Sequence, residues 1–192
     1  MALYSLSELS RNFQNSAQSR YASINLSESS KSFSGAYDIF LSHSSLDAEI
    51  VSSIKQHIES VMGFSVYVYW INDPSLTSAV TKANAQIIKS RMDACKSLIY
   101  AFTDNSVKSK WMPWELGYFD GKKNKVAILP ISSESTSSDS FLGQEYLGLY
   151  PYITKNGSSL SPNKEILWIH DSADTYVTFR GWLHDGLIPT KK

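Results

Sequence analysis

The sequence predicts an α/β protein with a central, mainly parallel sheet that helices cover on both faces. Short apolar segments bounded by turn residues alternate with longer segments of helical periodicity, and this alternation is typical of parallel sheets. The first apolar segment, residues 37–41, is typical of a buried strand and stops at the polar run Ser42-His43-Ser44. Ligands of open α/β sheets bind outside the carboxyl ends of the strands, so these three residues are expected to face a ligand crevice.

The remaining elements follow the same pattern along the chain. Strands are predicted at residues 37–41, 64–70, 97–102, 126–131 and 166–169, because each segment is apolar and is bounded by turn signals. Helices are predicted at 47–61, 79–95, 109–120 and near 175–186. The first helix is supported by the pair Ser44 and Asp47, which has the spacing of a helix start. It is also supported by apolar residues at helical spacing, namely Ile50, Val51, Ile54, Ile58 and Val61.

Two regions fall outside this alternation. Residues 1–35 are polar and rich in serine. Their main apolar residues have the spacing of one short amphipathic helix but are too few for a core; they are Leu3, Leu6, Leu9 and Phe13. This segment is either a docking or regulatory arm or a partly ordered leader to a domain at 36–192. Within that domain, an irregular segment is predicted near 132–163.

Composition limits the classes of function. The 192 residues suffice for one domain, and 18 basic residues balance 18 acidic ones, which argues against general binding to nucleic acid. No apolar run approaches the roughly 20 residues that span a membrane, and the start lacks the order of a signal peptide. The single Cys95 cannot form an internal disulfide and is expected to be a core residue. A cytoplasmic protein is therefore predicted.

Several kinds of site lack their motif. A glycine-rich GxGxxG turn does not follow the first strand, so a dinucleotide redox fold is excluded. The sequence has no HExxH or paired CxxC motif, and its four histidines do not have the spacing of metal ligands. No metal site is predicted.

Four segments, in their order and spacing, resemble the Toll/interleukin-1 receptor (TIR) domain family over residues 36–186. They are YDIFLSHSS, the strand at 64–69 with the long loop after it, KANAQIIKSRMDACKSLIYAFT, and KWMPWEL followed by VAILPI. The resemblance implies a flavodoxin-like, three-layer fold with a five-stranded sheet. It also implies one of two functions, because some TIR proteins are adaptors that self-associate, whereas others cleave NAD to nicotinamide and ADP-ribose or a cyclic isomer.

The enzymes of the family use a carboxylate early on the helix that follows the long second loop. The apolar pattern of Ile87, Ile88 and Met92 places this position at Asn84. Cleavage builds positive charge on the sugar carbon, which a carboxylate stabilises, and losing one such group typically costs about a hundred- to a thousandfold in rate. The resemblance therefore implies weak or conditional catalysis at Asn84. The alternative is that Asn84 is only a polar residue in the first helical turns.

Other residues are candidates for binding NAD as substrate. Tyr69, Trp70 and Trp111 are expected to wall the pocket, and His43 and Ser44 to hold the polar middle of the ligand, although tryptophans more often pack in cores and His43 has the alternative of bonding the backbone. No catalytic triad accompanies Ser42 and Ser44.

Two acidic residues also have competing interpretations. Asp73 is the nearest replacement for the missing carboxylate, although Asp-Pro is first a turn signal. Glu115 resembles an acidic residue common in TIR domains; it supports the site, or only orients its helix or the first loop through hydrogen bonds.

The leading hypothesis from this resemblance is an antiphage-defence TIR enzyme of bacteria. It would make a cyclic ADP-ribose-type signal after a phage-derived trigger, and the signal would activate a separate effector. The competing hypothesis is a catalytically silent adaptor that acts through contacts between TIR domains, since position 84 is not glutamate. The 71–81 loop and the 1–35 arm are the segments expected to control activity.

Overall fold

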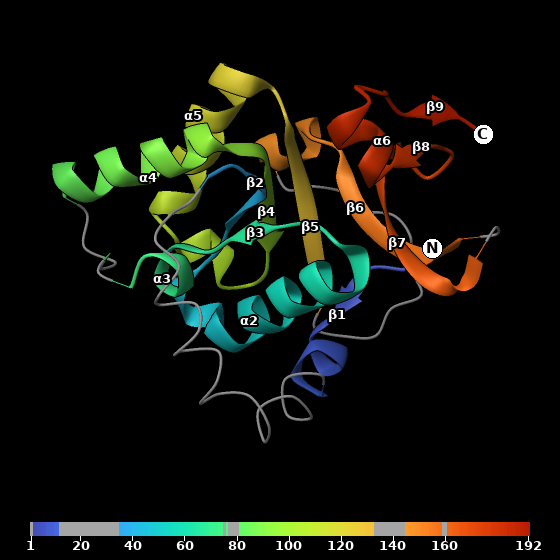
Figure 1. Cartoon of the computed structure of the whole chain (residues 1–192), viewed down its shortest axis with the longest axis horizontal. Coiled ribbons are helices and arrows are strands. Elements are labelled where there is room, and N and C mark those ends of the chain that lie inside the picture. The colour runs from blue at the N-terminus through green and yellow to red at the C-terminus, as the bar shows by residue number, and fades with distance from the viewer. Residues whose placement is uncertain (1, 12–34, 75, 77–80, 133–144, 159–160) are drawn as a thin grey trace.

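The computed structural model contains one mixed sheet with helices on both faces (Figure 1). The described residues are 2–11, 35–74, 76, 81–132, 145–158 and 161–192. Within them the strand order is β3-β2-β4-β5-β6-β7-β8-β9, and β1 pairs with β5. The strands are β1 (Tyr4–Ser5), β2 (Tyr37–Ser42), β3 (Val66–Tyr67), β4 (Cys95–Phe102), β5 (Val126–Ser132), β6 (Tyr152–Ser158), β7 (Ser161–Ser172), β8 (Thr175–Thr178) and β9 (Thr190–Lys191).

Strands β3, β2, β4, β5 and β6 pair in parallel, whereas β6 to β9 pair antiparallel. In chain order the parallel strands have the spatial order 2-1-3-4-5, which is that of flavodoxin-like folds. The predicted α/β class with a mainly parallel sheet is therefore confirmed.

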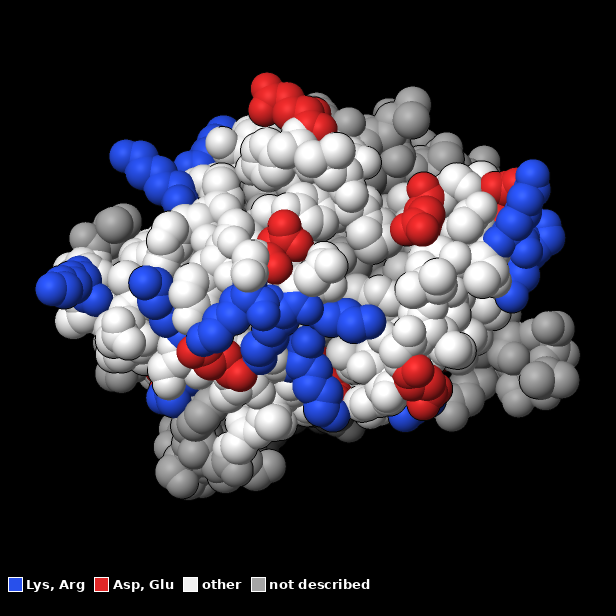
Figure 2. Space-filling view, turned by 90° about the horizontal axis from the view of Figure 1, so that it is seen from above, with Lys and Arg blue, Asp and Glu red and all other residues white. Residues whose placement is uncertain are grey.

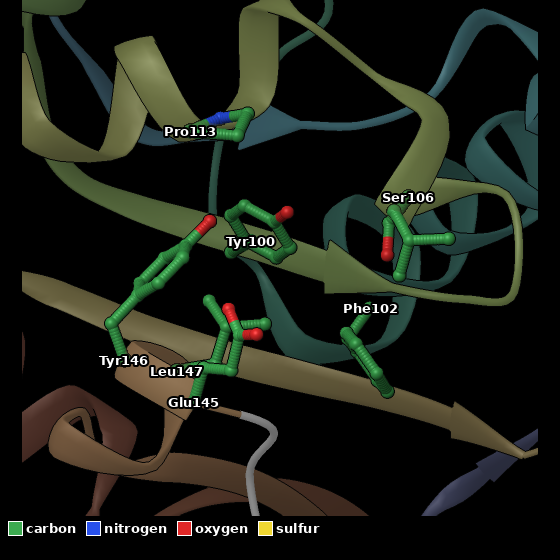
Figure 3. Close-up of a pocket in the computed structure, with 8 residues that line it drawn as sticks. Tyr100, Phe102, Ser106, Pro113, Glu145, Tyr146 and Leu147 are labelled. Atoms are coloured by element: carbon green, nitrogen blue, oxygen red, sulfur yellow. The ribbon is translucent and has the colours of Figure 1, made fainter.

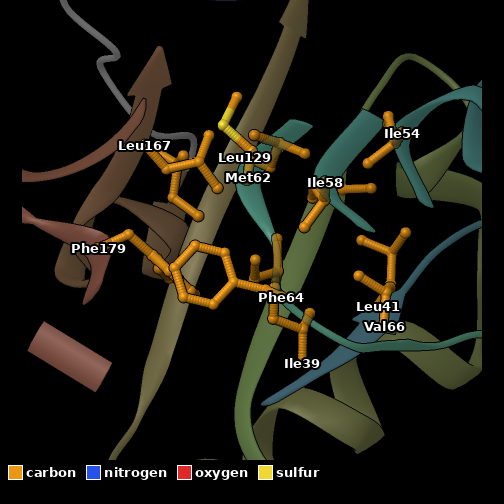
Figure 4. Packing of buried hydrophobic residues seen from close by; sticks show 14 of the residues in the cluster. Ile39, Leu41, Ile54, Ile58, Met62, Phe64, Val66, Leu129, Leu167 and Phe179 are labelled. Carbon is orange, nitrogen blue, oxygen red and sulfur yellow. The ribbon is translucent and has the colours of Figure 1, made fainter. Parts of the chain in front are cut away.

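Helices cover both faces of the sheet. They are η1 (Ser45–Asp47), α2 (Ala48–His57), η2 (Ile58–Met62), α3 (Tyr69–Asn72), α4 (Lys82–Ala94), η3 (Ser106–Lys108), α5 (Trp111–Lys123), η4 (Glu145–Leu149) and α6 (Phe179–His184). One core lies under α2 and α6 and contains Ile39, Leu41 and Phe64 (Figure 4). The other core lies under α4 and α5 and contains Phe40 and Tyr100.

Alternation along β2 decides which face each of its residues serves. Ile39 and Leu41 belong to the core under α2, and Phe40 belongs to the core under α5. Successive strand residues point to opposite faces, so Ser42 lies on the α5 face. Its neighbour in register on β4 is Tyr100 of the same face.

The structure corrects the predicted second strand. Only Val66–Tyr67 is a strand, and residues 69–72 form α3 instead. The Val68 N–H donates to the Asn72 side chain at 2.7 Å, and the Asn72 N–H donates to the Val68 carbonyl at 2.9 Å. These local bonds replace the ladder that a longer strand would need, because Asn side chains compete well for nearby backbone groups.

The C-terminal third also differs from the prediction. The fifth parallel strand is β6, within the segment predicted to be irregular, and the predicted strand at 166–169 is part of β7, which runs antiparallel. The sheet thus has more than the five strands expected. The predicted helix near 175–186 begins with strand β8, and α6 starts only after Thr178, whose hydroxyl accepts the Gly181 N–H at 3.2 Å.

Residues 2–11 contribute to the core of the domain, although their apolar side chains are too few to form a core of their own. Tyr4 and Leu9 are each 1% exposed and pack in the core under α2. The Ala2 N–H donates to the Lys155 carbonyl of β6 at 3.0 Å, and β1 pairs with β5. The N-terminal segment therefore forms backbone hydrogen bonds with both β5 and β6. Residues 6–11 form the short helix that was predicted here, whereas Phe13 and the rest of the arm lie outside the described residues.

Charged residues on the surface are mixed in sign. Figure 2 shows a face on which Lys and Arg side chains gather beside Asp and Glu side chains. Lys122 pairs with Asp93 at 2.7 Å, and Lys96 pairs with Asp38 at 2.9 Å. A partner that requires a uniformly basic surface, such as a phosphate backbone, does not find one on that face. In the described part of the chain, the helices are too short or too polar to cross a membrane.

Candidate active site

The carboxyl ends of β2 and β4 lie side by side, at the point where the strand order reverses. Such a switch point is where ligands of open α/β sheets bind. The loops after the two strands are fastened to each other by the buried Asp47, which accepts hydrogen bonds from Thr103 Oγ1 at 2.6 Å and Asn105 Nδ2 at 2.7 Å. Ser44 is also buried and caps η1, since its Oγ accepts the Leu46 N–H at 3.3 Å.

His43 is a neutral support for this edge. Its Nε2 accepts a hydrogen bond from Trp70 Nε1 at 3.0 Å. An indole nitrogen only donates, so the proton of His43 must be on Nδ1, which donates to the Leu41 carbonyl at 2.7 Å. Burial lowers the pKa of His43 to about 4, although the Leu41 carbonyl and then Asp47 act in the opposite direction.

The His43 ring also stacks on Tyr69, with centroids 5.1 Å apart. Three predicted binding residues, His43, Tyr69 and Trp70, are thus brought together. Both ring nitrogens of His43 form hydrogen bonds within the protein. The bond to the Leu41 carbonyl is the backbone contact expected as one of the two roles of this residue. The imidazole thus links the end of β2 to Trp70 of α3.

Ser42 and Glu115 form a buried pair between β2 and α5. Ser42 Oγ donates to Glu115 Oε2 at 2.6 Å, and both residues are almost fully buried. Burial raises the pKa of Glu115 to about 7, while the Ser42 hydroxyl acts to lower it. Glu115 also raises the pKa of Tyr69, after the larger effect of burial. The contact is the one expected if Glu115 orients its helix against the first loop.

Asp73 is already paired. Its Oδ2 accepts from Arg91 Nε at 2.7 Å and from the Tyr67 hydroxyl at 2.7 Å, and its Oδ1 accepts from Arg91 Nη2 at 2.9 Å. The bidentate arginine contact fixes the end of α3 to α4. Both oxygens of the Asp73 carboxylate are thus engaged within the protein.

Asn84 is the third residue of α4. Thr81 is the N-cap of this helix, and its Oγ1 accepts the Asn84 N–H at 3.1 Å. The side chain of Asn84 is half-buried and projects from the first turn, where the helix dipole favours negative charge. Residues 75 and 77–80, which precede the helix, lie outside the described residues.

Trp111 begins α5, four residues before Glu115. Its ring meets Trp114 edge to face, with centroids 5.2 Å apart, and it packs against the core under α5. Trp111 is only partly buried, so its side chain combines packing against the core with some exposure to solvent.

A pocket of about 550 Å³ lies between β4, η3, α5 and η4 and was not predicted (Figure 3). Its lining residues come from β4, η3, α5 and η4, and they are Tyr100, Phe102, Ser106, Val107, Pro113, Glu145, Tyr146 and Leu147. Tyr100 is the neighbour of Ser42 in register. The sequence signal for this pocket was the cluster of tyrosines near 146–152, within the segment predicted to be irregular.

The described residues contain no group of three or more potential metal ligands that would hold an ion. Cys95 is buried as expected, and burial raises the pKa of its thiol to about 12, so it is not a nucleophile at neutral pH.

Comparison with known proteins identifies the family. No protein-family model matches the chain. A protein of Bacillus cereus (strain MSX-D12) named "Probable 3' cyclic ADP-D-ribose synthase ThsB'" is 55% identical over 148 residues, which cover 77% of this chain and 75% of that protein. "Putative cyclic ADP-D-ribose synthase TIR2" of Cytobacillus dafuensis is 32% identical over 104 residues, 52% of this chain and 26% of that protein. With the flavodoxin-like strand order, the match to ThsB' shows that this chain belongs to the ThsB-like proteins of the TIR family.

Proposed function

We propose that this protein cleaves the bond between nicotinamide and ribose in NAD and closes the product to 3' cyclic ADP-ribose. The observation that carries the proposal is the 55% identity with ThsB', which bears the name of this activity. Nicotinamide leaves with the electron pair of the broken bond, and the sugar carbon becomes electron-deficient. An oxygen of the same molecule then attacks that carbon and loses its proton.

Asn84 faces the developing charge in this proposal. Its amide oxygen offers a dipole and a hydrogen-bond acceptor where other family enzymes have a carboxylate. Nicotinamide is cationic in NAD and leaves without a proton, so the lack of a full charge slows the reaction without abolishing it. The half-buried position of Asn84 in the first turn of α4 supports contact with a ligand.

The first experiment compares three proteins with NAD. Wild type is expected to release nicotinamide, Asn84→Ala to release it about tenfold more slowly, and Asn84→Glu to release it faster than wild type. Glutamate suits this third helical position, because it completes a capping box with Thr81. Chromatography of the purified protein, and of lysate from infected cells, measures the products.

Gln86→Ala provides a control, because Gln86 is an exposed residue of the same helix, two positions after Asn84. Its rate should equal that of wild type. If neither the purified wild type nor the lysate yields nicotinamide, the enzymatic proposal fails.

Cyclisation requires that the acceptor reach the sugar carbon before water does. Trp111 is the aromatic residue on α5 that we assign to the wall of the site, together with Tyr69 and Trp70 of α3. Trp111→Ala is therefore expected to shift the products toward linear ADP-ribose, because a loosened wall admits water. Mass spectrometry of the product mixture measures the ratio; unchanged proportions in a folded variant would return Trp111 to a packing role.

The alternative function is a catalytically silent adaptor, and the asparagine at position 84 favours it. An adaptor would keep its biological activity in a folded Asn84→Ala variant. Loss of activity with retained self-association excludes the adaptor.

The biological setting completes the proposal. The protein would act in the bacterial cytoplasm in Thoeris-type antiphage defence, after a phage-derived trigger. Its cyclic product would activate a separate effector. Assembly of TIR domains, with the 71–81 loop as the controlling segment, would switch the site on.

A further inference from the structure

We propose that the pocket between β4, η3, α5 and η4 binds an aromatic cation that carries no phosphate, such as an N-alkylated pyridinium. This inference goes beyond the proposed cleavage of NAD, because it concerns the pocket in Figure 3 and not the Asn84 site.

The shape and lining of the pocket favour a planar ring. A volume of about 550 Å³ is within the range of small-molecule sites. Tyr146 points toward Tyr100 in Figure 3, and Phe102 lines the same space. Aromatic side chains bind planar rings by stacking and bind cations through their negative faces.

The charge of the lining decides which rings fit. Glu145 is the only charged residue among the described lining residues, and its carboxylate points into the space between the aromatic rings (Figure 3). A carboxylate attracts a cation and repels phosphate or carboxylate groups. The lining has no Lys, Arg or His among the described residues, so a phosphate would lack a counter-charge.

Tyr100 remains neutral in the pocket. Burial raises the pKa of Tyr100 to about 12, and the neighbouring Tyr146 has a smaller effect in the same direction. The Tyr100 hydroxyl therefore keeps its proton at neutral pH.

The exposed rim of the pocket also separates it from ordinary core packing. Tyr146 is 40% exposed and Val107 is 65% exposed, so two apolar lining residues face solvent at its mouth. Glu145 has a φ of 49°, in the left-handed region that a glutamate rarely adopts. Backbone strain of this kind is common at ligand sites.

The test uses three probes that share one ring and differ in charge. They are 1-methylnicotinamide, a cation; nicotinamide, which is neutral; and nicotinate, an anion. Binding to the full chain is measured by titration and followed by NMR. Wild type is expected to bind the cation most tightly and the anion most weakly.

Two variants assign this order to the pocket. Tyr146→Ala should weaken binding of the cation by about tenfold. Glu145→Gln should remove most of the preference for the cation over nicotinamide, while the affinity for nicotinamide stays the same. Matched controls are Tyr118→Ala, on the outer part of α5, and Glu49→Gln, on α2; both should bind as wild type does.

Equal binding of the cation and the anion, or unchanged binding by Tyr146→Ala, would overturn the proposal. None of the probes contains a bond that the proposed reaction cleaves. Failure of this site and failure of NAD cleavage are therefore distinguishable.

Discussion

Tyr4→Ala is expected to lower the free energy of unfolding by about 3–5 kcal/mol, which is the usual cost of removing a large buried ring. Tyr4 is 1% exposed and lies in the core under α2. Its ring meets His57 edge to face at 5.8 Å and lies under the Lys155 ammonium at 4.8 Å. Removing it would leave a cavity in the core under α2 and weaken the docking of residues 2–11.

Tyr4→Phe is the matched control, and it is expected to stabilise the protein by about 1 kcal/mol. The Tyr4 hydroxyl is buried and has no hydrogen-bond partner among the described residues. Burial raises the pKa of this hydroxyl well above its ordinary value, and the charges of Glu165 and Glu8 raise it by smaller amounts. Phenylalanine keeps the packing and removes an unpaired polar group.

Urea unfolding of both variants measures these effects, and Leu46→Ala, at a side chain that is 66% exposed, should change stability little. A small effect of Tyr4→Ala would show that residues 2–11 do not dock in solution. Equal losses in the Ala and Phe variants would show that the hydroxyl has a partner. Deleting residues 1–35 should accordingly lower the melting temperature strongly, unlike the loss of a loosely attached arm.

The sequence predicted the strands whose apolar residues are continuous. β2, β4 and β5 are of this kind, and their predicted and observed bounds differ by at most two residues. β6 was missed because its sequence, YITKNGS, mixes apolar and polar residues and contains a glycine near its end. β1 has only two residues, which no periodicity can detect, although Tyr4 is almost completely buried.

Contacts of the candidate site were predictable where they are local and unpredictable where they depend on distant partners. The bond between His43 and the Leu41 carbonyl was one of two expected alternatives, since a turn places these groups together. The pairing of Asp73 with Arg91 links residues 18 positions apart across an irregular loop, and nothing in their spacing indicates it. The η4 wall of the pocket was hidden for the same reason.

Glu115→Gln is expected to change how stability depends on pH, because Glu115 and His43 have opposite effects in wild type. Glu115 titrates at about 7 in the folded protein and ordinarily at 4.5. Between these values the folded state holds a proton that the unfolded state has lost, so stability falls as pH rises. His43 titrates at about 4 when folded and ordinarily at 6.5, so it makes stability rise over that range.

The two contributions cancel between about pH 4.5 and 6.5, so in wild type the contribution of Glu115 and His43 to the free energy of unfolding does not change with pH over this range. Glutamine resembles the protonated form of Glu115 and leaves only the effect of His43. The stability of Glu115→Gln should therefore rise by about 2–3 kcal/mol from pH 4.5 to 6.5, at about 1.4 kcal/mol for each unit of pH. The free energy of unfolding of the variant minus that of wild type should be about 3 kcal/mol larger at pH 8 than at pH 4.

Urea unfolding across this pH range provides the measurement, and His43→Gln provides the mirror-image variant. Glutamine retains a donor and an acceptor for the Leu41 carbonyl and Trp70 but does not titrate, so the stability of this variant should fall between pH 4.5 and 7. Glu49→Gln alters an exposed carboxylate on α2 and should follow the wild-type curve. Parallel curves for Glu115→Gln and wild type would show that Glu115 is ionised in the folded protein at pH 5. Such a result would mean that the Ser42 hydroxyl and its surroundings outweigh the effect of burial on this carboxylate.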